Sequence, residues 1–177
     1  MYLSSLECKI YNIDFKDVID ARNKLLPPKE KETNIVLDIK DTSWFNKIDF
    51  DNGAIFFASG VFYYFLTSEV KELVNKMASY FKGCVLVFDA ANRFAVKLIK
   101  KTWLKKAKIK NVDAYFYVNN AYKELSIWNN NIKVSSKGYM LGYNSLKDKS
   151  VCPFFRFLSK VGDNFMKMQI VKIEFKQ

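Results

Sequence analysis

Apolar positions along the chain follow two spacings, which predict strands and helices in alternation. Short apolar runs predict strands at residues 8–13, 34–37, 54–58 and 84–88. Apolar residues spaced three and four positions apart predict helices at 15–26, 68–81 and 93–106, with a single turn at 44–48. The strand at 54–58 has no polar alternation, so we expect it to lie inside a parallel sheet. Thr67 is a candidate cap for the helix at 68–81, and Glu69 lies in its first turn.

The last third of the chain has a different pattern. It predicts a strand at 114–117, a helix at 121–128, a strand at 132–140, an irregular aromatic stretch at 152–158 and a terminal strand at 167–175. Little helix separates the two closing strands, which indicates an antiparallel hairpin. We therefore expect an α/β fold, in which a mostly parallel sheet carries an antiparallel edge hairpin. No linker interrupts the pattern, so residues 1–177 are interpreted as one domain.

The amino-acid composition excludes several kinds of catalytic and metal-binding site. The 177 residues are 50% apolar with only six glycines and three prolines, as in a folded domain. Histidine is absent, which excludes Ser-His-Asp and Cys-His nucleophile systems and every histidine-containing metal site. Three scattered cysteines without a C-x-x-C pair indicate neither a disulfide framework nor a thiol metal cluster, and they favour a reducing cytoplasm. No apolar run reaches the roughly 18 residues of a membrane helix, so we expect no membrane partner.

The net charge of +11 says less about partners than its size suggests. Of the 29 cations 26 are lysines, and this excess accompanies abundant Asn, Ile, Phe and Tyr, as in proteins from AT-rich genomes. Residues 93–110 hold eight cations and no acid, a run that could follow a phosphate backbone or form a solvated helix face. Nucleic-acid recognition favours arginine, of which the chain has three. The sequence therefore disfavours a nucleic-acid partner.

Polar residues follow four of the predicted strands, where ligands of open parallel sheets bind. They are Asp14, Asp38, the pair Ser59-Gly60, and Asp89. Asp14 could accept hydrogen bonds from both hydroxyls of a ribose, or it could cap the helix that follows. Asp38 could accept the amino hydrogens of an adenine, or it could cap the turn at 44–48. The residue pattern leaves both alternatives open.

Other features have more ordinary interpretations. Arg22 interrupts the apolar stripe of the helix at 15–26, so we expect it to form a structural ion pair or to be exposed. The aromatic residues at 115–117 and 154–155 fit either a core or the walls of an apolar pocket. The chain contains neither G-x-G-x-x-G nor G-x-x-x-x-G-K, and thus no glycine-rich phosphate loop.

Several motifs in order resemble the leucine carboxyl methyltransferase family, which includes bacterial O-methyltransferases of the polyketide-tailoring type. They are I-D-F-K-D-V-I-D-A-R at 13–22, V-L-D-I-K-D-T-S-W at 36–44, A-I-F-F-A-S-G-V-F-Y-Y-F at 54–65, V-L-V-F-D-A at 85–90 and E-L-S-I-W at 124–128. The resemblance implies a class I methyltransferase with a Rossmann-like sheet and S-adenosylmethionine as cofactor. It also implies methyl transfer to an oxygen or carboxylate of a small-molecule acceptor.

The resemblance assigns cofactor-binding residues by position. It implies that Asp14 binds the ribose, that Asp38 and Ile39 flank the adenine, and that Ser59 and Tyr64 lie at the family's A-E-G motif and the tyrosine after it. Arg22 is the matching arginine of the first motif. No residue is identified as a general base, and no metal site is implied.

This chain departs from the family at three places. Lys16 replaces a proline, Ser59 replaces the glutamate expected near the methionine amino group, and the chain begins at the family's second strand, without the glycine-rich loop. We therefore expect an N-terminally truncated methyltransferase domain with unpaired sheet edges and an uncovered apolar face. An alternative function is an inactive module that pairs an open edge with itself or another polypeptide. A third is a nucleic-acid binder that uses residues 93–110.

Overall fold

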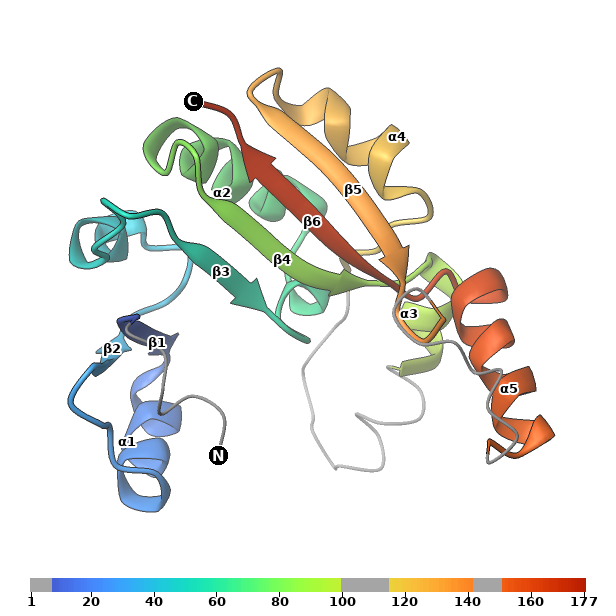
Figure 1. Cartoon of the computed structure of the whole chain (residues 1–177), viewed down its shortest axis with the longest axis horizontal. Helices are drawn as coiled ribbons and strands as arrows, with labels where there is room; N and C mark the ends of the chain where they lie inside the picture. Colours follow the sequence, from blue (N-terminus) through green and yellow to red (C-terminus); the bar gives the residue numbers. More distant parts are fainter. Residues whose placement is uncertain (1–7, 100–114, 142–150) are drawn as a thin grey trace. The chain divides into compact units, whose positions relative to one another are not determined.

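The computed structural model describes residues 8–99, 115–141 and 151–177. The chain divides into two compact units, Met1–Asn52 and Gly53–Gln177, and each is described by itself (Figure 1). The interpretation of residues 1–177 as one domain stays a prediction. None of the helices in the described residues combines the length and apolar composition needed to cross a membrane.

The first unit is a parallel two-stranded sheet with one α-helix. Its elements are β1 (Ile10–Asp14), α1 (Lys16–Leu25), β2 (Glu32–Val36) and the 3-10 helix η1 (Thr42–Lys47). β1 and β2 pair with Asp14 opposite Val36. The backbone carbonyl of Asp14 also accepts the N–H of Leu37 at 3.1 Å, so the chain leaves both strands at the same edge.

The second unit is a four-stranded mixed sheet covered by helices. Its elements are β3 (Ile55–Ala58), η2 (Phe62–Tyr64), α2 (Thr67–Tyr80), β4 (Val85–Ala90), α3 (Arg93–Ile99), α4 (Ala121–Leu125), η4 (Ser126–Trp128), β5 (Ile132–Gly138), α5 (Pro153–Lys160), the π-helix η5 (Val161–Phe165) and β6 (Gln169–Phe175). The strand order is β3-β4-β6-β5. β3 and β4 are parallel, whereas β6 is antiparallel to both β4 and β5. The expected parallel sheet with a closing antiparallel hairpin is confirmed.

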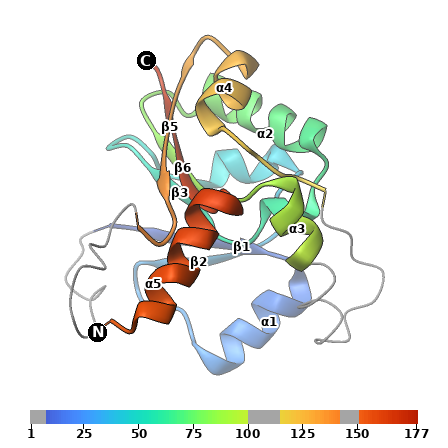
Figure 2. The same ribbon diagram turned by 90° about the vertical axis from the view of Figure 1, so that its right-hand side faces the viewer.

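One face of this four-stranded sheet carries the core. Alternate residues of β4 and β6, including Leu86, Phe88, Val171 and Ile173, are at most 2% exposed. α2 and α4 lie on one side of the sheet in Figure 2. The buried ring of Phe62 meets Phe88 edge-on, with 5.0 Å between centroids. Aromatic packing of this kind anchors the turn after β3 to the sheet.

The opposite face is far less covered. Ile55 and Phe57 of β3 are 63% and 76% exposed. Their partners on the same face of β4, Val85 and Val87, are half-buried. This face changes toward β6 and β5, where Lys172, Glu174 and Lys133 form salt bridges. An apolar patch therefore remains exposed on the β3 side of the sheet.

Both sheets end in strands that pair on one side only within the described residues. β1 pairs with β2 alone, and β3 pairs with β4 alone. The expectation of two unpaired edges is thus confirmed. The expectation that β3 lies inside a parallel sheet is wrong, because β3 is an edge strand of its sheet and two of its four residues are strongly exposed.

Three local predictions also differ from the structure. Thr67 is the first residue of α2 and not its cap, although Glu69 accepts the backbone N–H of Leu66 at 2.8 Å from the first turn, as expected. The predicted strand at 114–117 is absent from residues 115–117, whereas Ala114 lies outside the described residues. The predicted irregular stretch at 152–158 is mostly the helix α5, which begins at Pro153, a residue suited to the first helical position. The predicted helix at 93–106 is α3 as far as Ile99, and its remainder lies outside the described residues.

Candidate cofactor site

Asp14 and Asp38 lie at the same edge of the β1–β2 sheet. Asp14 is the last residue of β1, and Asp38 comes two residues after the end of β2. Because the strands are parallel and Asp14 is opposite Val36, the topology brings both carboxylates to the carboxyl edge of the sheet. The sequence prediction of their placement is confirmed; their roles in binding stay a prediction.

The carboxylate of Asp14 is exposed and only partly engaged. Its Oδ1 accepts the N–H of Phe15 at 2.8 Å. Phe15, not Asp14, is the residue that precedes the first turn of α1, and it makes no side-chain cap. The alternative that Asp14 caps this helix is therefore wrong. An exposed carboxylate with a free oxygen suits a ribose, whose two hydroxyls are hydrogen-bond donors.

Asp38 is half-buried and does not cap the turn that follows. Its Oδ1 accepts the N–H of Lys40 at 2.9 Å, whereas Asp41 accepts the N–H of Ser43 at 3.0 Å and caps η1. Hydrogen bonds from the Ser43 backbone and hydroxyl lower the pKa of Asp41. The second acid of the D-x-x-D segment is thus structural, which frees Asp38 for a ligand.

Ile39 is held in place through its backbone. The indole Nε1 of Trp44 donates to the carbonyl oxygen of Ile39 at 3.0 Å, and Trp44 itself is 2% exposed. A buried anchor of this kind fixes the backbone next to Asp38. The half-buried Ile39 side chain offers an apolar surface of the type that a flat base packs against.

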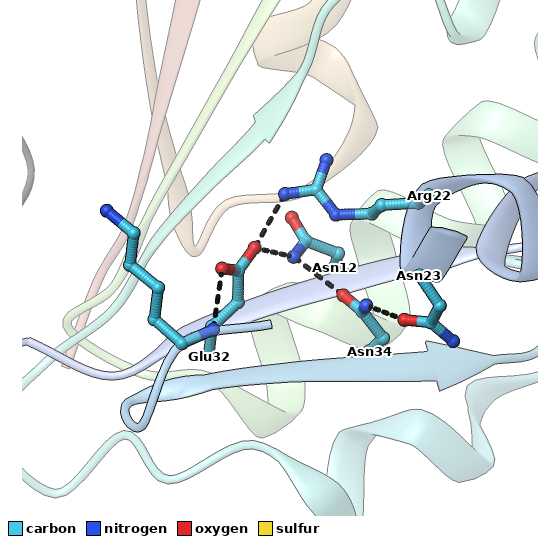
Figure 3. Close-up of polar contacts among 6 residues, drawn as sticks. Asn12, Arg22, Asn23, Glu32 and Asn34 are labelled. Carbon is cyan, nitrogen blue, oxygen red and sulfur yellow. Dashed lines mark hydrogen bonds and ion pairs between the residues drawn. The ribbon is translucent and has the colours of Figure 1, made fainter. Parts of the chain in front are cut away.

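Arg22 lies in a polar network that joins α1 to the sheet (Figure 3). Its Nη2 donates to Glu32 Oε1 at 2.6 Å. Asn12 Nδ2 donates to the same carboxylate oxygen at 2.7 Å and to Asn34 Oδ1 at 2.9 Å, and Asn34 Nδ2 donates to Asn23 Oδ1. These contacts, together with the N–H of Lys29, lower the pKa of Glu32, with the Arg22 hydrogen bond as the largest cause. The expected structural ion pair of Arg22 is confirmed.

Ser59 and Tyr64 lie in the second unit, after the carboxyl end of β3. Ser59 directly follows the last residue of β3 and is exposed, and Tyr64 is 45% exposed at the end of η2. Between them Gly60 has φ +69°, in the left-handed region that favours glycine. A Cβ at Gly60 would have no neighbour within 4 Å, so the turn is open to a ligand.

Sequence reasoning missed the contacts that fix this turn. Asp89 of β4 accepts the Gly60 N–H at 2.6 Å. Burial, the Asp89 charge and a hydrogen bond to Asp89 raise the pKa of Tyr63, which keeps its phenol protonated as a donor. The strand-end position of Asp89 was the available signal; its partner Tyr63 had none, because both Tyr63 and Tyr64 fit the motif equally.

The other candidate residues have structural roles or lie elsewhere. Phe116 is fully buried and contacts Phe62 and Phe88, so it belongs to the core. Phe154 and Phe155 are 60% and 61% exposed on α5. Most of the basic run at 93–110 lies outside the described residues; the Arg93 guanidinium lies 5.9 Å from the centre of the Tyr117 ring. The described residues contain no group of three His, Cys, Asp or Glu that could hold a metal ion.

A parallel β1–β2 pair, parallel β3 and β4 and an antiparallel closing hairpin define an α/β fold. Solved structures identify the fold more closely as that of S-adenosylmethionine-dependent methyltransferases. No protein-family model and no curated protein matches the chain. The expected resemblance to methyltransferases is thus confirmed at the level of the fold.

Three of these solved structures show the extent of the likeness. A protein assigned as a methyltransferase from Thermobifida fusca matches with a TM-score of 0.63 and 14% identity over 96% of this chain and 64% of its own. A DUF574 family protein from Streptomyces avermitilis gives 0.64 and 9% over 96% and 65%. A SAM-dependent methyltransferase from Anabaena variabilis gives 0.59 and 9% over 95% and 68%. The chain thus spans about two thirds of the length of these proteins.

Proposed function

We propose that the chain belongs to an S-adenosylmethionine-dependent O-methyltransferase and holds the adenosine half of its cofactor site. The observation that carries the proposal is the meeting of Asp14 and Asp38 at the carboxyl edge of the β1–β2 sheet, in a fold shared with solved methyltransferases. The donor and acceptor chemistry fits: Asp14 would accept the ribose hydroxyls, Asp38 the amino group of adenine, and Ile39 would pack against the base.

When bound, S-adenosylmethionine would supply the methyl group. The residues of this chain would hold and orient it, and orientation of two reactants is itself a large part of catalysis for a transfer of this type. Ser59 and Tyr64, both exposed after β3, are assigned to the cofactor by the motif resemblance alone. We infer an oxygen or carboxylate of a small molecule as the acceptor from the motifs shared with carboxyl and polyketide O-methyltransferases. The scattered cysteines support a cytoplasmic location.

Calorimetric titration with S-adenosylmethionine tests the proposal. Asp14→Asn keeps an oxygen for the Phe15 N–H but loses the charge, so we expect it to raise the Kd about tenfold, because a hydrogen bond to a charged group contributes about 1.5–3 kcal/mol. Asp20→Asn is the matched control, since Asp20 is an exposed acid of α1 that pairs with Lys16. Absence of binding up to about 1 mM for the unmodified chain would contradict the proposal.

The open edge of β3 favours a second function, that of an interaction module. β3 pairs with β4 alone in the described residues, and Ile55 and Phe57 expose an apolar surface beside that edge. Unpaired edge strands with apolar side chains accept a strand from a second polypeptide or a second copy.

A further inference from the structure

The helix α5 turns an apolar side outward. Phe154, Phe155 and Phe157 are 60%, 61% and 62% exposed, and Leu158 is 44% exposed. The buried residue of this helix is Ser159, whose hydroxyl donates to the carbonyl oxygen of Phe155 at 2.8 Å. A helix that packs on a core does the reverse and buries its apolar stripe. The apolar side of α5 is therefore a candidate contact surface for a partner.

Exposed phenylalanines also occur on the elements next to α5. The rings of Phe165 in η5 and Phe94 in α3 meet edge-on, with 5.4 Å between centroids, and these side chains are 62% and 52% exposed. Asn92, just before α3, donates from its side chain to the carbonyl oxygen of Phe165 at 2.7 Å, so the start of α3 is held against η5. The α3–α5 surface consists of Phe94, Phe154, Phe155, Phe157, Leu158 and Phe165.

Cations accompany the α3–α5 surface. Arg156 and Lys160 are four residues apart and therefore lie on one side of α5, and Lys97 is exposed on α3. Neither Lys97 nor Lys160 forms an ion pair with an acid among the described residues. The acid nearest to Lys160 along the chain, Asp163, accepts the N–H of Leu141 at 2.6 Å. These lysine charges are thus available to an anionic partner.

The net positive charge of the chain belongs entirely to the second unit. Residues 53–177 hold 21 cations and eight acids, whereas residues 1–52 hold eight cations and ten acids. Cations are about equally frequent in both units, as expected when the whole chain shares a lysine-rich composition. The difference comes from acids, which are scarce in the second unit only. Such an asymmetry favours an anionic partner for this unit.

An apolar helix side flanked by cations fits the surface of an anionic lipid membrane. Phenylalanine and leucine enter the boundary between headgroups and acyl chains, while lysines attract the anionic headgroups. A helix of this kind lies along the membrane surface. The expectation of no membrane partner concerned only a membrane-spanning helix, for which the described residues hold no candidate.

The same charge would also attract a nucleic acid, but the apolar side chains favour lipid. Bases stack on single aromatic rings distributed along a basic groove. On α5, three phenylalanines and a leucine lie within five consecutive residues, and the leucine offers no ring for stacking. We propose that the second unit binds anionic lipid membranes peripherally through the α3–α5 surface.

Flotation of the full chain with lipid vesicles tests this proposal. We expect binding to vesicles of equimolar phosphatidylserine and phosphatidylcholine, and binding about tenfold weaker or less to phosphatidylcholine alone, because each lysine at the surface adds attraction to anionic headgroups. Phe155→Ser should weaken binding to the anionic vesicles about tenfold, since it removes a large apolar side chain from the contact. Phe57→Ser is the matched control, because Phe57 is 76% exposed on β3 of the same unit.

A charge variant separates the electrostatic part of the binding. Lys160→Gln should weaken binding to the anionic vesicles about fivefold and leave binding to phosphatidylcholine unchanged. Lys123→Gln, at an exposed lysine of α4, is the control and should leave both unchanged.

Tryptophan fluorescence reports on the position of the contact. With anionic vesicles, the emission of Phe155→Trp should shift to shorter wavelength relative to the unmodified chain, because the indole leaves water for the lipid boundary. Phe57→Trp should show no such shift.

The other outcomes contradict the proposal. Absence of binding to anionic vesicles overturns it, and so does equal binding to both kinds of vesicle. An equal loss in Phe155→Ser and Phe57→Ser, or an unshifted emission of bound Phe155→Trp, also overturns it, because the contact then lies elsewhere. Binding to a single-stranded oligonucleotide that is tighter than to anionic vesicles and lost in Phe155→Ser would make this a nucleic-acid surface instead. None of these results depends on the cofactor, so the proposed function is tested separately.

Discussion

Glu32 joins α1 to the β1–β2 sheet through several donors at once. Arg22, Asn12 and the backbone of Lys29 all donate to its carboxylate, whose side chain is 13% exposed. α1 has only one buried residue, Ile19, so polar contacts carry a large part of its attachment. A network of this kind stabilises strongly when complete and poorly when one member is missing.

The Glu32 carboxylate should make the first unit sensitive to acid. Its pKa lies below the ordinary 4.5 because Arg22, Asn12 and Lys29 donate to the ionised form. The stabilisation is therefore fully present above pH 4.5 and is lost as the pH falls through the lowered value. We expect the protection factors of amide hydrogens in β1 and β2, corrected for the pH dependence of intrinsic exchange, to fall below pH 4.5 in the unmodified chain. Glu32→Gln should lose most of this pH dependence.

The exposed Lys16–Asp20 pair provides the control for this prediction. Asp20→Asn should leave the acid response of β1 and β2 almost unchanged, because exposed i,i+4 pairs contribute little. Equal responses of Glu32→Gln and Asp20→Asn would show that the network does not attach the helix.

At this scale the sequence predicted which residues matter better than what they contact. Arg22 in an apolar stripe correctly indicated an ion pair, but its partner Glu32 lies on another element and has no signature in the sequence. Asp38 was a candidate cap for the turn at 44–48, but Asp41 caps η1, because both acids precede this turn and only the backbone path decides between them. Tyr63 was missed for a similar reason: its contact with Asp89 depends on how η2 packs over β4.

β3 is the element through which the chain is expected to associate in solution. It is a four-residue edge strand with Ile55 and Phe57 strongly exposed, while Ala58 is buried and Phe56 packs its ring 4.6 Å from that of Phe81. One face of β3 is thus anchored, and the other presents apolar side chains on a strand that pairs on one side only in the described residues. Pairing of this edge with another chain would cover both.

Phe57→Lys tests whether this edge associates. We expect the unmodified chain to show concentration-dependent association in light scattering, and Phe57→Lys to abolish it, since a charged residue on an edge strand opposes pairing. Because Phe57 is 76% exposed, the free energy of unfolding should change by less than about 0.5 kcal/mol.

Phe154→Lys, at a phenylalanine 60% exposed on α5, is the matched control and should leave association unchanged. A chain that stays monomeric at every concentration would contradict self-pairing through β3.

Sequence patterns predicted the element order well and the surroundings of each element poorly. β3 reads as an interior strand because all four residues are apolar, yet its position at an edge depends on which strands are present beside it. The strand predicted at 114–117 includes the fully buried Phe116, but the backbone of its described residues, 115–117, joins no sheet. The sequence did not predict the helix α5, because its three phenylalanines are exposed and so show no core-facing pattern.

The matched solved structures share the fold of this chain, and each match extends over nearly all of its residues. The chain aligns over 95–96% of its residues with three solved structures whose chains are about half as long again. Its strands form two sheets, one of β1 and β2 and one of β3, β4, β6 and β5, each with an edge strand that pairs on one side in the described part of the chain.

Amide signals in two-dimensional NMR test this account most directly, because single N–H groups report on each proposed contact. The N–H groups of Phe15 and Lys40 donate to Asp14 and Asp38. We predict that S-adenosylhomocysteine shifts both signals with one saturation curve. The N–H of Leu141, which donates to Asp163, should stay unchanged. Two unmoved signals at about 1 mM ligand would contradict the account.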